Sequence, residues 1–143
     1  MRIPYHIKQE AIWIVRGYEQ RRRNYGQMRA EILGRTVAGA GDGTPHGSDV
    51  THPTEDKALE LQRLERWPEV KKMRAVEYAE RQIGQDILSD EVRGRLKNAI
   101  LQNTKSGRRY PFEKLGLSEF SRMDFYRRKT KFLADVASFL EML

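Results

Sequence analysis

The stretch Leu115–Leu140, "LGLSEFSRMDFYRRKTKFLADVASFL", predicts a glycine turn followed by an amphipathic helix. Gly116 suits the end of a short helix over residues 110–116, because glycine readily adopts the left-handed backbone that ends many helices. Ser118 or Ser121 would cap the next helix, since a serine hydroxyl accepts a hydrogen bond from the first turn. This order of short helix, turn and capped helix is typical of a helix-turn-helix at about residues 110–141.

The last helix separates into two faces at about 100° per residue. One face is apolar and predicts a packed back: Phe125, Phe132, Val136, Phe139 and Leu140. The opposite face carries Met123, Arg127, Thr130 and Lys131, with Arg122 and Arg128 at its flanks. A helix that enters the major groove of DNA needs such a packed back and a polar front at its N-terminal end.

The side chains on this front predict two roles on DNA. Arg127 is long enough to reach a guanine edge, and Arg122 and Tyr126 are the next candidates for reading bases. Five further cations are expected on phosphates, where they position a protein without reading sequence: Lys105, Arg108, Arg109, Arg128 and Lys131. The competing interpretation is a basic helix face that is only solvated.

Positive charge is concentrated towards the end of the chain. The net charge is +7, and residues 105–131 alone have nine cations and three anions. Residues 37–104 have ten cations and twelve anions, and residues 1–36 have eight and three. A basic region of this kind is expected of a protein that binds a polyanion, although a basic surface alone is not specific for one.

The composition argues against several other classes. The chain has no cysteine, which excludes disulfides and thiolate chemistry, and no stretch is apolar enough for a membrane span or a signal peptide. We therefore expect a cytoplasmic protein without a membrane partner. The sequence has no nucleotide-binding loop or hydrolase motif, and we expect neither an enzyme nor a cofactor. His46, Asp49 and His52 lie within seven residues, but a glycine-rich loop gives them no fixed geometry, so no metal site is expected.

Upstream, the sequence predicts one long helix and then a linker. Apolar residues from Ile7 to Ile32 recur at spacings of four and three, interrupted by Arg21, which predicts a helix over 5–34 that needs a partner helix. That partner is either the segment 54–66 or a second copy of the chain. Residues 37–53 are rich in glycine and turn-forming residues and predict a flexible linker.

The remaining segments also have helical periodicity. Pro53 suits the first turn of a helix, Pro68 restarts a helix that is expected to continue towards Ile87, and Ser89 is a credible N-cap for the next one. No convincing strand pattern is present. We therefore predict an all-α protein, with a long N-terminal helix in residues 1–36, a linker in 37–53 and a compact helical DNA-binding domain in 54–143.

Two stretches resemble the phage-encoded RinA/ArpU-like transcriptional regulators. "LGLSEFSRMDFYRRKTKFLADVASFL" is similar to the serine-capped basic and aromatic helix at the end of those proteins, and "SDVTHPTEDKALEL" (48–61) is similar to their linker-to-helix signature. The resemblance covers about residues 48–143. It implies a helix-turn-helix like that of region four of bacterial sigma factors.

The resemblance and the charge pattern together predict a phage or prophage transcriptional regulator that binds double-stranded DNA. A likeness to sigma region four further implies contact with RNA polymerase, and the N-terminal helix suggests a homodimer. Two alternatives stay open. The first is a DNA-packaging subunit like the small terminase subunits, and the second is a helical adaptor that binds only proteins.

Overall fold

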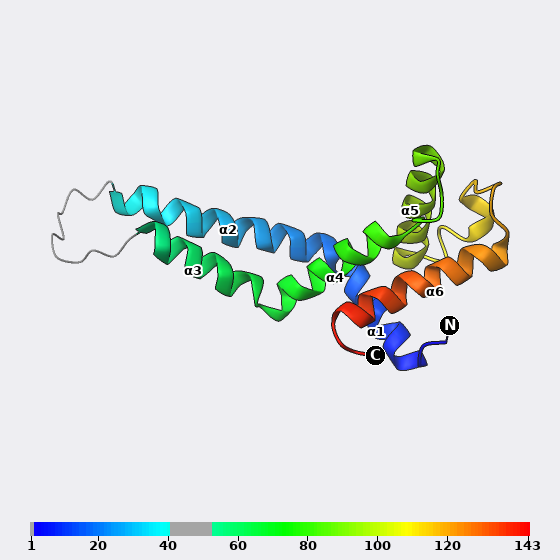
Figure 1. Cartoon of the computed structure of the whole chain (residues 1–143), viewed down its shortest axis with the longest axis horizontal. Coiled ribbons are helices and arrows are strands. Elements are labelled where there is room, and N and C mark those ends of the chain that lie inside the picture. Colours follow the sequence, from blue (N-terminus) through cyan, green and yellow to red (C-terminus); the bar gives the residue numbers. More distant parts are fainter. Residues whose placement is uncertain (1, 41–52) are drawn as a thin grey trace. The chain divides into compact units, whose positions relative to one another are not determined.

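The computed structural model describes residues 2–40 and 53–143, with side chains for residues 2–34 and 55–143. This part of the chain is helical, without strands, which confirms the all-α prediction (Figure 1). The helices are α1 (Tyr5–Arg16), α2 (Tyr18–Ala40), α3 (Pro53–Glu65), α4 (Pro68–Gln82), α5 (Asp90–Lys105), the 3₁₀ helix η1 (Phe112–Lys114) and α6 (Arg122–Phe139). None of these helices is long and apolar enough to cross a bilayer.

The chain forms two compact units. Unit 1 contains Met1–Tyr18 and Lys72–Leu143, and unit 2 contains Glu19–Lys71. These bounds differ from the predicted segments 1–36 and 54–143, because α1 packs on α5 and α6 rather than forming an arm with α2. Of the predicted linker, residues 37–40 belong to α2 and Pro53 begins α3, while residues 41–52 lie outside the described residues.

The single long helix expected over residues 5–34 is two helices in the structure. α1 ends at Arg16 and α2 begins at Tyr18, with Gly17 between them. The predicted apolar seam is divided accordingly. Its residues up to Tyr18 belong to unit 1, where Ala11 and Ile14 are buried, and its residues from Tyr25 onward belong to unit 2. A heptad-like spacing does not reveal this division, because both halves keep the same period.

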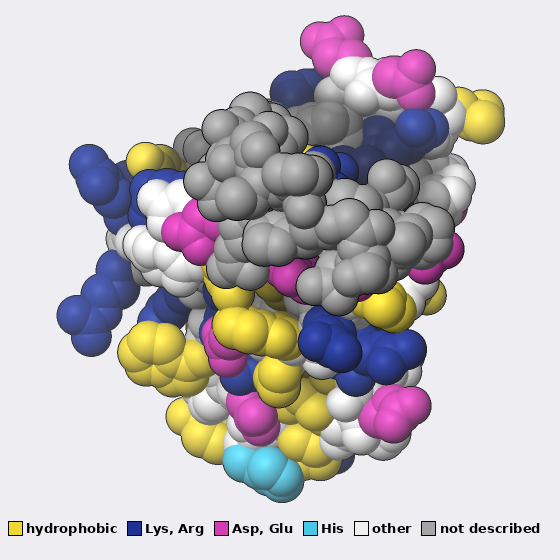
Figure 2. Space-filling model, turned by 90° about the vertical axis from the view of Figure 1, so that its left-hand side faces the viewer, with side chains coloured by type: hydrophobic (Ala, Val, Ile, Leu, Met, Phe, Trp, Pro, Cys, Tyr) yellow, Lys and Arg dark blue, Asp and Glu magenta, His cyan; other side chains and the backbone are white. Residues whose placement is uncertain are grey.

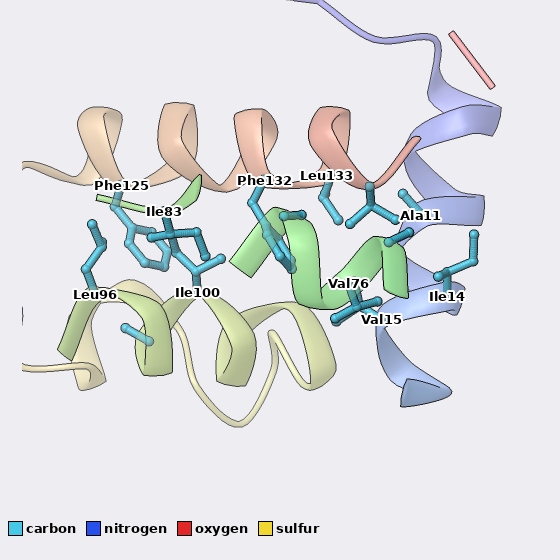
Figure 3. Packing of buried hydrophobic residues seen from close by; sticks show 14 of the residues in the cluster. Ala11, Ile14, Val15, Val76, Ile83, Leu96, Ile100, Phe125, Phe132 and Leu133 are labelled. Carbon is cyan, nitrogen blue, oxygen red and sulfur yellow. The ribbon is translucent and has the colours of Figure 1, made fainter. Parts of the chain in front are cut away.

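The core of unit 1 joins four helices. Phe125 and Phe132 of α6 point towards α4 and α5, where Ile83, Leu96 and Ile100 lie (Figure 3). Leu133, the next residue after Phe132, lies between Phe132 and Ala11 of α1 (Figure 3). All of these side chains are buried, and the burial of Phe125, Phe132 and Val136 confirms the predicted apolar face of the last helix. Phe139 of that face is 43% exposed and contacts Tyr78 instead, with ring centroids 5.4 Å apart.

In unit 2, α2 lies alongside α3 (Figure 1). The hydroxyl of Tyr25 donates a hydrogen bond of 2.5 Å to Glu65. Met28, Ile32 and Leu64 line a pocket in this unit together with neighbouring residues. The second half of the predicted seam therefore has its partner within the same chain, as one of the two predicted arrangements required.

Local capping chemistry fixes several helix ends where the sequence predicted them. The Ser89 hydroxyl accepts a hydrogen bond from the backbone N–H of Val92 at 3.3 Å, and the Ser121 hydroxyl accepts one from Asp124 at 3.0 Å. Gly116 has the predicted left-handed backbone, with φ +65°. Pro68 begins α4 as expected. The predicted short helix before Gly116 is the single 3₁₀ turn η1.

Helix α4 ends earlier than its periodicity predicted. It stops at Gln82, because Gly84 turns the chain with φ +73°. The carbonyl of Gly84 then accepts a hydrogen bond of 3.2 Å from Nε of Arg93. Ile87, which the sequence placed on the helix, lies in the following loop and packs against the core from there.

Replacing Gly84 by alanine is expected to lower the free energy of unfolding by about 1–2 kcal/mol, since L-residues disfavour a positive φ. The added Cβ would also lie 2.8 Å from Cγ of Arg93. The control is Gly94→Ala in α5, where an added Cβ meets nothing within 4 Å. The higher helix propensity of alanine should raise the free energy of unfolding of this variant by up to about 1 kcal/mol. Urea denaturation measures the free energy of unfolding of both variants. A Gly84→Ala protein that is as stable as wild type would contradict the proposed role of this turn.

Candidate nucleic-acid interface

The N-terminal half of α6 presents the predicted polar front. Ser121 fixes where the helix begins, and the complete burial of Phe125 fixes which face turns inward. Met123 is then 83% exposed, and the side chain of Arg127 is 75% exposed. Because the side of α6 that contains Phe125 is buried, Arg127 projects outward, one and a half turns after the helix begins.

The three predicted base readers differ in their surroundings. Arg127 forms an ion pair of 2.5 Å with Asp124, one turn earlier on the exposed side of α6. Arg122 pairs with Glu113 of η1, and its guanidinium lies 5.2 Å from the centroid of the Tyr126 ring. Tyr126 is half-buried and packs edge-on against Phe125, so its ring supports Arg122 more than it projects outward.

Asp124 organises the cations around the helix start. Its carboxylate accepts hydrogen bonds from Arg127 at 2.5 Å and Arg128 at 3.1 Å. Burial acts to raise the pKa of Asp124, and the two arginines outweigh it, so that the pKa lies below its usual value. The carboxylate therefore stays ionised and orders both arginines at neutral pH.

Arg128, predicted to contact phosphate, lies in a different environment. Its guanidinium donates two hydrogen bonds to Asp86, of 2.9 and 2.7 Å, and another to Asp124. Only 20% of its side chain is exposed, and it lies 5.3 Å from the centroid of the Phe120 ring. The hydrogen bonds from Arg128 lower the pKa of Asp86 to about 2, and those from Asp86 raise the pKa of Arg128. Arg128 thus ties α6 to the loop before α5.

The other predicted phosphate contacts form two groups. Lys131 lies on the exposed front of α6 and pairs with Asp135 at 2.8 Å. Lys105 ends α5, and Arg108 and Arg109 follow it in an exposed turn. That turn is held by Asn103, whose side-chain amide donates a hydrogen bond of 2.9 Å to the carbonyl of Tyr110.

Ion pairing between residues far apart in the sequence is the feature that the sequence did not reveal. Arg122, Arg127, Arg128 and Lys131 all have carboxylate partners within unit 1. On the face shown in Figure 2, which is another side of the molecule, Lys and Arg side chains lie among Asp and Glu side chains. The i,i+3 and i,i+4 pairs were readable from spacing, but the pairing of Arg128 with Asp86 joins residues 42 apart and needs the fold.

Sequence reasoning also missed Lys129, which it counted among the basic residues without a role. Lys129 is half-buried, and its ammonium lies 5.9 Å from the Tyr126 ring centroid. Its position between Phe125 and Leu133 at a spacing of four was a readable signal, since that spacing places it on the buried side of the helix.

No metal site is present among the described residues. His46, Asp49 and His52 lie in residues 41–52, outside the described part of the chain. The chain was compared with family models, curated proteins and solved structures, and none of them matches it.

Proposed function

We propose that this protein binds double-stranded DNA through a helix-turn-helix at about residues 110–141, in which η1, the turn around Gly116 and α6 take part. The observation that carries the proposal is the two-sided character of α6. Phe125 and Phe132 are buried on one side, and Arg127 and Lys131 are exposed on the other. The N-terminal half of α6 would enter the major groove, while cations beside it contact phosphates.

The ion pairs on α6 are compatible with this role. Arg127–Asp124 and Lys131–Asp135 are pairs within one helix whose cations are largely exposed, and such pairs contribute only about 0.3–0.5 kcal/mol. A guanine edge or a phosphate can therefore replace the carboxylate at little cost. The carboxylates would hold the two side chains outward until DNA arrives.

The proposed role is transcription regulation, of the phage or prophage type. It is supported by the resemblance of residues 48–143 to RinA/ArpU-like regulators with a helix-turn-helix like sigma region four. RNA polymerase is a proposed partner on the same ground. The proposed homodimer would use the N-terminal helical region, in which Leu33 of α2 is an exposed apolar side chain.

Two variants of α6 test the direct reading of DNA. Arg127→Ala is expected to lose about 1–3 kcal/mol of binding free energy on the specific site and little on random DNA. A contact with a base edge contributes to binding only where the DNA presents the base that the side chain recognises. Lys131→Ala should weaken binding to the specific site and to random DNA alike. It should also reduce the magnitude of the slope of log affinity against log salt concentration by about one. Genomic-fragment selection with sequencing supplies the site, and titration of specific and scrambled duplexes gives the free energies.

Arg63→Gln serves as the control, since Arg63 is an exposed cation of unit 2 outside the proposed interface. If Arg127→Ala keeps full discrimination, Arg122→Ala is the next variant to measure. If neither variant changes discrimination, α6 does not read bases. If the wild-type protein binds no duplex at low salt, DNA binding itself is excluded.

A further inference from the structure

The outward face of α1 presents two exposed aromatic side chains. Ala11 and Val15 of this helix are buried in the core of unit 1, which fixes the rotation of the helix (Figure 3). On the opposite face, Tyr5 is 75% exposed and Trp13 is 67% exposed. Tyr5, Gln9 and Trp13 follow one another at a spacing of four, so they form one row along the helix. The two rings lie about 12 Å apart along the helix axis.

Arg16 continues this row and orders the Trp13 ring. It follows Trp13 by three residues, and its guanidinium carbon lies 5.8 Å from the centroid of the indole ring. Its Nε donates a hydrogen bond of 3.3 Å to the carbonyl of Thr104 near the end of α5. The guanidinium is therefore anchored on unit 1 and supports the ring through a cation–π contact. The indole stays mostly exposed, so Arg16 orders the ring without covering it.

The charge of this face favours an anionic partner. Residues 2–16 contain three cations, Arg2, Lys8 and Arg16, and one anion, Glu10. Arg16 has no carboxylate within 4.0 Å in the part of the chain that the structure describes, in contrast to the exposed cations of α6. Its terminal nitrogens can therefore donate hydrogen bonds to a phosphate without giving up an ion pair.

We propose that the outward face of α1 binds single-stranded nucleic acid, with Trp13 and Tyr5 stacking on bases and Arg16 contacting phosphate. Bases expose their flat faces where a strand is unpaired, so aromatic side chains in water recognise single strands rather than duplexes. Stacking accepts every base, and the cations follow the backbone. The proposal goes beyond duplex binding by α6 and does not depend on it, because the two surfaces use different side chains.

A membrane surface fits this face less well than a nucleic acid does. A helix that lies in a membrane interface inserts its apolar face among the lipids. The apolar face of α1, with Ala11 and Val15, is already buried in unit 1. The row that remains outward includes the amide of Gln9 and the guanidinium of Arg16.

The chain has two tryptophans, so the contact can be observed directly. In the full-length Trp67→Phe protein, tryptophan fluorescence reports Trp13 alone. A short oligothymidylate at low salt is expected to quench this fluorescence and to saturate, because a stacked base lies against the indole ring. In the Trp13→Phe protein, where Trp67 reports, the same oligonucleotide should change the fluorescence little. An oligouridylate of the same length shows whether the surface prefers RNA or DNA.

Substitution measures how much the stacking contributes. Trp13→Ala is expected to weaken binding of the oligothymidylate by about fivefold to 140-fold, the range found for loss of one stacked base. The matched control is Trp67→Ala, which removes the other tryptophan, 50% exposed in unit 2, and should leave the affinity unchanged. Tyr5→Ala should also weaken binding. Arg16→Gln should reduce the magnitude of the slope of log affinity against log salt concentration by about 0.7.

Because Tyr5 and Trp13 are exposed, both alanine variants should keep the wild-type circular dichroism spectrum and unfolding curve. Equal affinities of wild type and Trp13→Ala would overturn the proposal, as would failure of the wild-type protein to bind either oligonucleotide. If lipid vesicles of phosphatidylcholine and phosphatidylserine quench Trp13 and the oligonucleotides do not, the face belongs to a membrane contact instead. Loss of duplex binding in Arg127→Ala, with single-strand binding intact, would concern only the proposed function.

Discussion

Replacing Phe132 by alanine is expected to remove about 3–5 kcal/mol from the free energy of unfolding. Phe132 is 1% exposed and lies in the core of unit 1, where α6 meets α4 and α5 (Figure 3). Truncation would take away the buried area of the ring and leave a cavity that close-packed neighbours fill only in part. Urea denaturation followed by circular dichroism measures the loss.

Phe139→Ala is the matched control, because it makes the same change on the same helix at a side chain that is 43% exposed. Its ring touches Tyr78, and an aromatic pair contributes about 0.5–1.5 kcal/mol, so a smaller loss is expected. Equal losses for the two variants would mean that α6 is not packed with Phe132 inward. The assignment of Arg127 to the exposed front would then fail as well, since both depend on the same rotation of the helix.

The affinity for duplex DNA is expected to fall by about 250-fold to about 4,000-fold between 50 and 200 mM salt. This range corresponds to a slope of roughly −4 to −6 in log affinity against log salt, as expected when several phosphates release their counterions. Residues 105–131 contain nine cations, and among them Arg122, Arg127, Arg128 and Lys131 each have a carboxylate partner in unit 1. We therefore expect a slope nearer to −4, because a paired cation must first give up that partner.

Fluorescence anisotropy with a labelled duplex at a series of salt concentrations gives the slope. Arg63→Gln in unit 2, an exposed cation outside the proposed interface, should leave it unchanged. An affinity that barely responds to salt would rule out the electrostatic basis of DNA binding. A slope that changes as much for Arg63→Gln as for Lys131→Ala would show that the contact surface lies elsewhere.

The features that the sequence predicted correctly depend on neighbouring residues. Ser89 and Ser121 cap helices because each hydroxyl accepts a hydrogen bond from the backbone N–H three residues later. This contact does not depend on distant parts of the chain. The buried and exposed faces of α6 follow in the same way from its helical period. The position of Gly116 in the left-handed region needs only the steric freedom of glycine.

The features that the sequence did not reveal depend on residues far apart in the chain. The pairing of Arg128 with Asp86 turned an expected phosphate contact into a link within unit 1. The division between α1 and α2 also depends on packing that local periodicity does not encode.

The bounds of the two units have a consequence for how the protein folds and for how it can be divided. Unit 2, with 53 residues, is an insertion between the two segments of unit 1. The core of unit 1 forms only when α1 reaches helices that follow much later in the sequence, and closing so long a loop carries an entropic cost. A fragment of residues 54–143 would lack Ala11, Ile14 and Val15, and so would expose the surface of α5 and α6 that α1 covers.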